Sequence, residues 1–178
     1  MAEYLAFSPT AEVLGQSVLA IVGGMENNRA RALQLLEEQG LSPLEPGRWY
    51  PQQPVLDVFR AIFERIGPST VRAIGRKVPD WAIFPRAVSI EDALRGIEVA
   101  YQANHRHGDI GHYRFESTGL RSGQVVCENP YPCDFDRGLI EAVAERARPA
   151  HSLRVRVEHA PDGCRRQGET ACTYAVSW

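Results

Sequence analysis

The chain has 178 residues, a formal net charge of −2, 44% hydrophobic and 24% charged residues, which is ordinary for a soluble globular protein. The charge argues against nucleic acid as the main partner, because no excess of basic residues offsets phosphate charge. The length suits one domain, and we expect a single domain over 1–178, with a mainly helical part over 1–90 and a helix plus antiparallel β-β-α-β-β part over 91–178.

The N-terminal stretch has no basic residue before its first apolar ones, and the run SVLAIVGGM is too short to cross a membrane. We therefore expect a cytoplasmic protein. Thiols stay reduced in that compartment, so the four cysteines indicate metal ligation, redox chemistry or plain packing before they indicate disulfides.

The first half of the chain is mainly helical in pattern. Ser8-Pro9 suits a helix start, although the β-branched run SVLAIV that follows suits a strand equally well, and both interpretations stay open. Apolar spacing predicts helices from 26 to 39, from 54 to 66, from 68 to a stop at Pro79, and from 89 to 106 with Ser89 as the N-terminal cap. The proline-rich segment 41–54 and the segment 81–89 are expected to be loops.

The period changes after residue 107. Alternation over 111–117 and 123–128 predicts a β-hairpin, and CDFDRGLIEAVAERA from 133 to 147 predicts a helix. Two further half-buried strands are expected in SLRVRVEHA (152–160) and ACTYAVSW (171–178). Antiparallel strands packed against helices define an α+β fold class.

Three cysteines fall in this last part, each on a different predicted element. Cys133 opens the helix, Cys164 lies in the loop between the last two strands, and Cys172 lies on the last strand. A structural zinc takes four soft ligands from segments that meet after folding. A carboxylate or imidazole from Glu158, His159 or Asp162 would complete the set. The alternative is that the cysteines pack as small apolar residues.

The order of helix and hairpin, Cys133 in YPCDFDRGLIEAVAE and the closing E-H-x-x-x-G-C-x7-C-x-Y stretch resemble the 4-vinyl reductase-like small-molecule-binding domains. That family is related to haem nitric-oxide-binding and TRAPP-type domains. The resemblance covers about residues 90–178 well and 15–90 loosely. In phenol-sensing activators of this family a structural zinc is held at the positions of Cys133, Glu158, Cys164 and Cys172. More residues separate Glu158 from Cys164 than in those sensors, so His159 and Asp162 remain alternatives to Glu158.

The resemblance also implies an apolar cavity between sheet and helices, for a small hydrophobic or aromatic ligand. The candidate ligand-binding residues are Trp81, Phe84, Tyr101, His105, Tyr113 and Phe115, with Ile83 and Trp49 as further lining. The alternative is that these residues pack in the core, as such residues more often do. His105, His107 and His112 suit a metal or haem iron, with His105 the best placed, or else the end of the preceding helix.

No Gly-rich phosphate loop, nucleophile elbow or HExxH motif occurs, and we assign no catalytic residue. A reactive Cys127 or Cys133 would need a base, and the sequence supplies none beside either cysteine. The sequence therefore predicts a small-molecule-binding sensory or regulatory domain with a structural zinc, acting as a homodimer on a partner signalling protein. The alternatives are a haem-binding gas or redox sensor and an enzyme or chaperone of tetrapyrrole metabolism.

Overall fold

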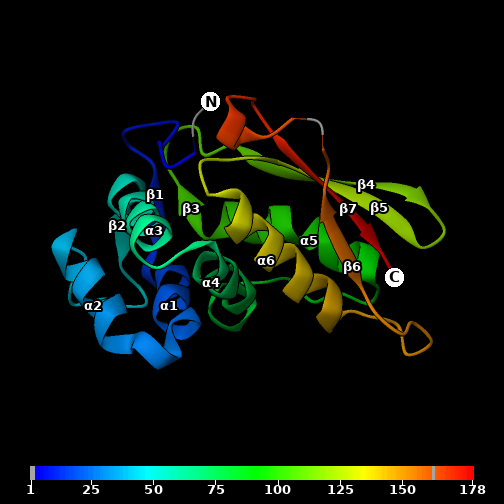
Figure 1. Cartoon of the computed structure of the whole chain (residues 1–178), viewed down its shortest axis with the longest axis horizontal. Coiled ribbons are helices and arrows are strands. Elements are labelled where there is room, and N and C mark those ends of the chain that lie inside the picture. The colour runs from blue at the N-terminus through cyan, green and yellow to red at the C-terminus, as the bar shows by residue number, and fades with distance from the viewer. Residues whose placement is uncertain (1–2, 162) are drawn as a thin grey trace.

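A computed structural model describes residues 3–161 and 163–178. The helices α1 to α4 lie at one end of the molecule, and the larger sheet lies at the other end with α5 and α6 beside it (Figure 1). The helices are α1 Gly15–Gly24, α2 Arg29–Glu38, α3 Gln52–Arg65, α4 Pro68–Trp81, α5 Ile90–Ala103 and α6 Cys133–Arg146, with short 3-10 turns η1 Glu26–Asn28 and η2 Arg165–Gln167. The strands are β1 Glu12–Leu14, β2 Trp49–Pro51, β3 His105–Arg106, β4 His112–Gly119, β5 Ser122–Glu128, β6 Arg156–His159 and β7 Cys172–Ser177.

The larger sheet confirms the predicted α+β class and the β-β-α-β-β order. Its strands run β4-β5-β7-β6, and every neighbouring pair is antiparallel. Side chains alternate along β5 and β7, so that Val125, Cys127, Cys172, Tyr174 and Val176 are buried. The helices α5 and α6 lie along one side of this sheet (Figure 1). The sheet and α6 therefore bring the three C-terminal cysteines to one end of the molecule.

In the helical half the structure decides one alternative that the sequence left open and corrects two predictions. The run SVLAIV is helical within α1, because Val18, Ile21 and Val22 fall on one buried helical face. The proline-rich segment contains β2, which pairs with β1 in a small second sheet of order β2-β1-β3. The helix α4 continues past Pro79 to Trp81, and the amide of Ala82 still donates to the carbonyl of Val78 at 2.9 Å. Pro79 removes one helical hydrogen bond without ending the helix.

Two glycines allow α4 and α6 to pack with their backbones in contact. A Cβ on Gly75 would lie 2.1 Å from the carbonyl oxygen of Phe135, and a Cβ on Gly138 would lie 2.1 Å from that of Arg72. Only glycine permits such an approach. The buried carboxylate of Glu141 reinforces the crossing by accepting hydrogen bonds from Arg72 at 2.8 Å and from Arg76 at 3.1 Å. This crossing sets the position of the first turns of α6, which carry residues of the candidate site.

No helix of residues 3–161 and 163–178 combines the length and the apolar character needed to cross a lipid bilayer.

Candidate functional site: a four-donor cluster beside an apolar cavity

Four side chains with metal-binding atoms converge at the start of α6. They are Cys133, His159, Cys164 and Cys172, and one donor atom from each lies within 4.8 Å of the others. The sulfur of Cys133 lies 3.2 Å from that of Cys172 and 3.4 Å from that of Cys164, while the sulfurs of Cys164 and Cys172 are 4.0 Å apart. Cys133 is the first residue of α6, His159 the last of β6 and Cys172 the first of β7. Segments far apart in sequence thus supply donors to one point. We call these four residues the thiolate cluster.

The spacing of these donors suits a tetrahedral metal ion. Zinc bonds to thiolate sulfur at about 2.3 Å, which places the sulfurs about 3.8 Å apart around a tetrahedron. The observed sulfur separations of 3.2, 3.4 and 4.0 Å lie close to that value. Three sulfurs and one imidazole are soft to intermediate ligands, a set that zinc prefers over magnesium or calcium.

The proton distribution within the cluster also favours ligation. A hydrogen bond from Cys133 and the nearby Arg165 guanidinium lower the pKa of Cys172 to about 4. The same hydrogen bond, together with burial, raises the pKa of Cys133. Before a metal binds, the pair therefore holds one proton on Cys133 and one negative charge on Cys172. A thiolate, the protonation state that binds metals, is already present at neutral pH.

His159, and not Glu158, completes the cluster. The Nδ1 of His159 lies 2.6 Å from the carbonyl oxygen of Ala160, while its buried Nε2 has no hydrogen-bond partner. An imidazole that donates through Nδ1 and leaves Nε2 free is in the tautomer that ligates a metal. Glu158 points away because neighbouring strand residues face opposite sides; it is exposed and pairs with Arg156 at 2.8 Å. Asp162 lies outside the described residues.

The N-terminal segment closes over the cluster through Glu3. Its carboxylate lies 2.7 Å from the sulfur of Cys133 and accepts a hydrogen bond of 2.8 Å from the backbone N–H of Cys133. It thereby caps α6, whose own N-cap residue, Pro132, makes no side-chain cap. Arg166 pairs with Glu3 at 3.3 Å and with Asp134 at 2.7 Å. The sequence analysis did not connect Glu3 with the cluster, since the two are separated by almost the whole chain.

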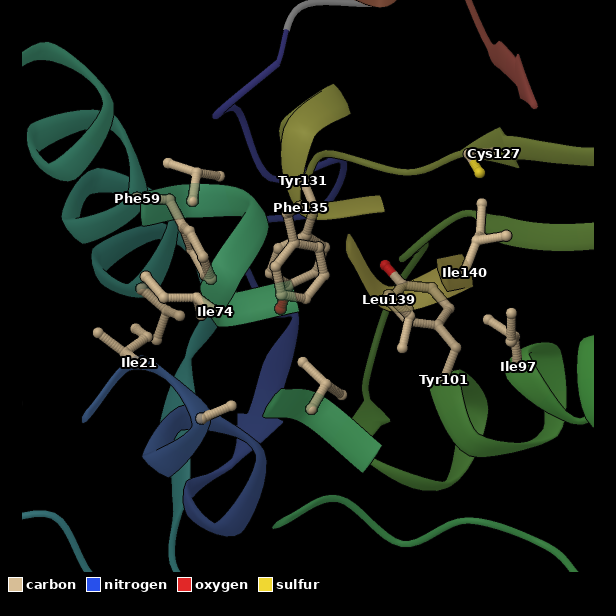
Figure 2. Close-up of a cluster of buried hydrophobic side chains, with 14 of the residues drawn as sticks. Ile21, Phe59, Ile74, Ile97, Tyr101, Cys127, Tyr131, Phe135, Leu139 and Ile140 are labelled. Carbon is tan, nitrogen blue, oxygen red and sulfur yellow. The ribbon is translucent and has the colours of Figure 1, made fainter. Parts of the chain in front are cut away.

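A cavity lies next to this end of α6, between the helical half and the sheet. Its volume is about 50 Å³. Tyr131 and Phe135, which flank Cys133, stack in its wall with ring centroids 4.9 Å apart (Figure 2). Phe59 packs edge-on against Phe135 at 5.0 Å. The free space is narrow because these rings occupy most of the gap.

His105 is the polar centre of the cavity wall. Its Nε2 lies 2.8 Å from the hydroxyl of Tyr131, and its Nδ1 lies 2.9 Å from the carbonyl oxygen of Tyr101. A carbonyl only accepts, so Nδ1 carries the proton and Nε2 accepts from Tyr131. Burial lowers the pKa of His105 to about 4. The imidazole is therefore neutral at physiological pH, and both of its ring nitrogens are hydrogen-bonded within the protein.

A second polar group lies beside this pair. The side chain of Gln52 is fully buried, and neither its amide nitrogen nor its amide oxygen has a well-formed hydrogen bond. It lies near the hydroxyls of Tyr101 and Tyr131 and lowers the pKa of both, against the larger effect of burial, which raises them. Buried amides are normally satisfied, so this one marks a place where a further polar atom would bind.

The structure divides the residues expected to bind a ligand into two groups. Phe84, Tyr101, His105 and Tyr113 line the cavity. Trp81 and Phe115 are not among the lining residues of the described chain: Trp81 packs against Gly23, and Phe115 lies under the guanidinium of Arg95. Ile83 is exposed, Trp49 lies under Arg106, and His107 and His112 lie near Glu12 and Glu128 at 3.7 and 3.5 Å.

The sequence analysis missed much of the cavity wall. Phe59, Leu139, Tyr131 and Phe135 come from helical or loop positions that also suit a core, so no local signal marks them. Ser17 and Asn104 also line the cavity and hydrogen-bond each other at 2.8 Å, although 87 positions separate them.

Known structures share this fold, although sequence comparison finds no relative. No protein-family model and no curated protein sequence matches the chain. Among solved structures, an H-NOX protein from S. oneidensis in the Fe(II)NO ligation state has 12% identity and a TM-score of 0.67 over 92% of this chain and 98% of that one. A mutant of T. Tengcongensis H-NOX has 13% identity and a TM-score of 0.63 over 90% of this chain and 94% of that one.

The chain has the H-NOX fold. The predicted relation to haem nitric-oxide-binding domains is therefore confirmed at the level of the fold, while the assignment to the 4-vinyl reductase-like family stays a prediction. The H-NOX likeness extends over both the helical half and the sheet, whereas the sequence resemblance was good only after residue 90. At 12 to 13% identity, the shared H-NOX fold does not show which ligand this chain binds.

Proposed function

We propose that this chain is a sensory domain that binds a small molecule in the cavity beside His105 and holds a structural zinc on the thiolate cluster. The observation that carries the sensory part is the neutral His105–Tyr131 pair in an otherwise apolar cavity wall. The fold supports the same class of function, because the S. oneidensis neighbour carries NO on Fe(II) within this architecture.

The wall of the cavity favours an uncharged ligand. Its lining in the described chain contains no Asp, Glu, Lys or Arg. A charged ligand would be desolvated there without a partner, which is unfavourable by several kcal/mol. Of the lining residues, His105 and Tyr131 supply hydrogen bonds for one polar group. The ligand we propose is therefore small and mostly apolar, with a single hydroxyl, carbonyl or similar group.

Zinc fits the thiolate cluster in donor type and spacing. Cys133, His159, Cys164 and Cys172 would hold it, and the ion would join the start of α6 to β6 and β7. Such an ion contributes folding free energy directly, because the unfolded chain has no preformed site. It has no open position for a reacting molecule once all four ligands are bound, which is typical of a structural zinc.

Two neighbouring residues provide a test of the zinc site. We expect one zinc per chain by elemental analysis of the purified protein, and His159→Gln to weaken zinc binding by at least tenfold in a chelator competition. Glu158→Gln is the matched control, since its carboxylate pairs with Arg156 outside the cluster. If both variants lose zinc equally, or if neither does, the assigned ligand set is wrong.

Haem is the second candidate ligand, and the fold together with His105 favours it. The neutral imidazole, with Nδ1 bonded to a backbone carbonyl, suits an axial ligand. The remainder of the cavity does not fit a haem as it stands. The hydroxyl of Tyr131 occupies Nε2, the stacked Tyr131 and Phe135 rings fill the gap, and no basic side chain of the described lining faces a propionate.

A haem titration separates the two candidate ligands. We expect no stoichiometric Soret band when haem is added to the purified protein, and no difference between wild type and His105→Ala. A Soret band that saturates at one haem per chain and shifts in His105→Ala would establish the haem candidate and overturn the proposal of a haem-free cavity. Native mass spectrometry of the same preparation tests for a co-purified small molecule and for the predicted homodimer. The homodimer, the signalling partner and the cytoplasmic location stay predictions.

A further inference from the structure

A buried arginine connects the thiolate cluster with the cavity. Arg165 follows Cys164 directly, at the start of the η2 turn, and its side chain is 1% exposed. It is the largest of the fully buried side chains in the described part of the protein. An arginine is buried only when its donors are paired, and the partners of Arg165 lie on two sides.

On one side Arg165 contacts the sulfur of Cys172. Its backbone N–H lies 3.4 Å from this sulfur and its Nε lies 3.5 Å from it. With zinc and three thiolates bound, the cluster would carry one net negative charge. The guanidinium of Arg165 is the buried positive charge beside it, and hydrogen bonds to a ligand sulfur adjust how much charge the sulfur donates to the metal.

On the other side Arg165 holds two residues that position the cavity wall. Its Nη1 donates to Asn129, whose side-chain oxygen it meets at 2.7 Å, and the same oxygen accepts from the backbone N–H of Tyr131 at 2.9 Å. Its Nη2 pairs with Asp136, whose carboxylate is fully buried. Asp136 in turn accepts a hydrogen bond of 2.6 Å from the hydroxyl of Tyr113. Tyr113 and Tyr131 both line the cavity.

Metal binding would move the start of α6, which lies next to two residues of the cavity wall, Tyr131 and Phe135. The sulfur of Cys133 lies 3.4 and 3.2 Å from the two other sulfurs. A tetrahedral zinc requires about 3.8 Å, so the sulfur of Cys133 must move by roughly half an ångström. Tyr131 and Phe135 lie two positions to either side of Cys133, and their stacked rings fill the cavity. A shift of this size changes a space that holds only a few water-sized molecules.

We propose that zinc on the thiolate cluster sets the ligand affinity of the cavity, with Arg165 as the positioning residue that couples the two through Asn129 and Asp136. This rests on the zinc site proposed above. Coupling of this kind is reciprocal, so a ligand in the cavity also changes the affinity of the cluster for zinc. The physical basis is a continuous set of buried hydrogen bonds from Cys172 to Tyr113 and Tyr131.

The test uses xenon as a neutral apolar probe of the cavity. We expect zinc to change the xenon affinity of the wild type at least fivefold, measured by 129Xe NMR on zinc-loaded and zinc-free protein, and to shift the ring 15N resonances of His105. In the double variant Arg165→Met/Asp136→Asn, which removes both charges of the buried pair together, zinc still binds and its effect on xenon affinity falls below twofold. Asn129→Ala, which interrupts only the branch to Tyr131, gives an intermediate effect and serves if the double variant fails to fold.

Arg166→Met is the matched control. Arg166 is the next residue and contacts Glu3 and Asp134 beside the cluster, but the structure gives it no bond to Asn129 or Asp136. We expect the full wild-type coupling in this variant. If the wild-type protein binds zinc and neither the xenon affinity nor the ring 15N resonances of His105 change, the coupling is wrong and the zinc site stands. Coupling that survives in both relay variants overturns the role of Arg165. Wild-type protein that binds no zinc overturns the zinc site and the coupling together.

Discussion

The thiolate cluster and the cavity are adjacent, yet they are built in opposite ways. The cluster gathers donors that are incompletely satisfied: His159 Nε2 has no partner, and three sulfurs crowd within 4.0 Å. In the cavity wall, His105, Asn104 and Tyr101 all have hydrogen-bond partners within the protein. Donor atoms that lack partners gain them when a metal ion binds. Polar groups that are already hydrogen-bonded within the protein must break those bonds before they can bind a ligand. The cluster therefore resembles a structural element and the cavity a responsive one.

Removing zinc should give one of the largest effects on stability, because it removes the ligand that completes the cluster. At a free zinc concentration of about 1,000 times Kd, the ion contributes about 4 kcal/mol to the free energy of unfolding. We expect chelation or Cys172→Ala to lower the stability by about this amount in urea titrations, with the loss of one bound zinc. The control is Cys127→Ala, which removes a buried thiol paired opposite Cys172 in the sheet but outside the cluster. Equal zinc contents in Cys127→Ala and Cys172→Ala would contradict the assignment.

Truncating Phe135 should affect the cavity and spare the cluster. Phe135→Ala removes a buried ring that stacks on Tyr131 and packs against Phe59 (Figure 2), and such truncations destabilise by about 3 to 5 kcal/mol. We expect that loss in urea titrations, an unchanged zinc content and tighter xenon binding, since the free space grows. Phe115→Ala is the comparison, because Phe115 was also expected in the pocket but lies outside its wall. A xenon affinity that rises equally in Phe115→Ala would mean that the cavity has been placed wrongly.

The difference between the thiolate cluster and the cavity also explains which of the two the sequence could predict. The cysteines of the cluster were identifiable because few residue types bind zinc, and the predicted helix and strands placed them on separate elements. The fourth member of the cluster depended on strand register: His159 and Glu158 are neighbours, and only the pleat of β6 decides which one faces Cys133. The α+β class followed from hydrophobic periodicity, but β2 did not, because its prolines mimic a loop.

The cavity was much less predictable. Its wall is made of Phe, Leu, Val and Tyr residues that are chemically the same as those of the core. Choosing aromatic residues by type found Tyr101 and Tyr113 and also selected Trp81 and Phe115, which pack elsewhere. Arg165 stands in the polar segment CRRQGE, a composition typical of a surface loop. Its burial depends on Asp136 and Asn129, which belong to distant parts of the chain and become neighbours only in three dimensions.

The protonation of His105 tests how closed the cavity wall is. Burial lowers its pKa from an ordinary value of 6.5 to about 4, so between these values the unfolded chain binds more protons and stability falls as the pH falls. Asp136 has the opposite sign: burial raises its pKa from 3.8 to about 6, and stability rises as the pH falls through that interval. The two effects, each on the order of 3 kcal/mol, largely cancel in the wild type.

His105→Phe should separate these two effects. We expect the variant to gain stability relative to the wild type as the pH is lowered from 6.5 to 4, measured as the difference between parallel urea titrations. In the wild type the ring 15N resonances of His105 should titrate near pH 4. Titration near pH 6.5 would mean that water reaches His105 freely and that the wall is open.

Substitution of Gln52 should change the free energy of unfolding least, and the sign of the change is informative. If its buried amide lacks a partner in the protein, Gln52→Met removes a desolvated polar group and should raise the free energy of unfolding by about 1 to 2 kcal/mol. Gln53→Met is the comparison: that amide accepts from the N–H of Ala6 at 2.9 Å and donates to the carbonyl of Tyr4 at 3.0 Å, so its loss should lower stability by about 1 kcal/mol. Opposite signs would mark Gln52 as a buried amide without a partner in the protein. Equal losses in the two variants would mean that an ordered water already satisfies Gln52.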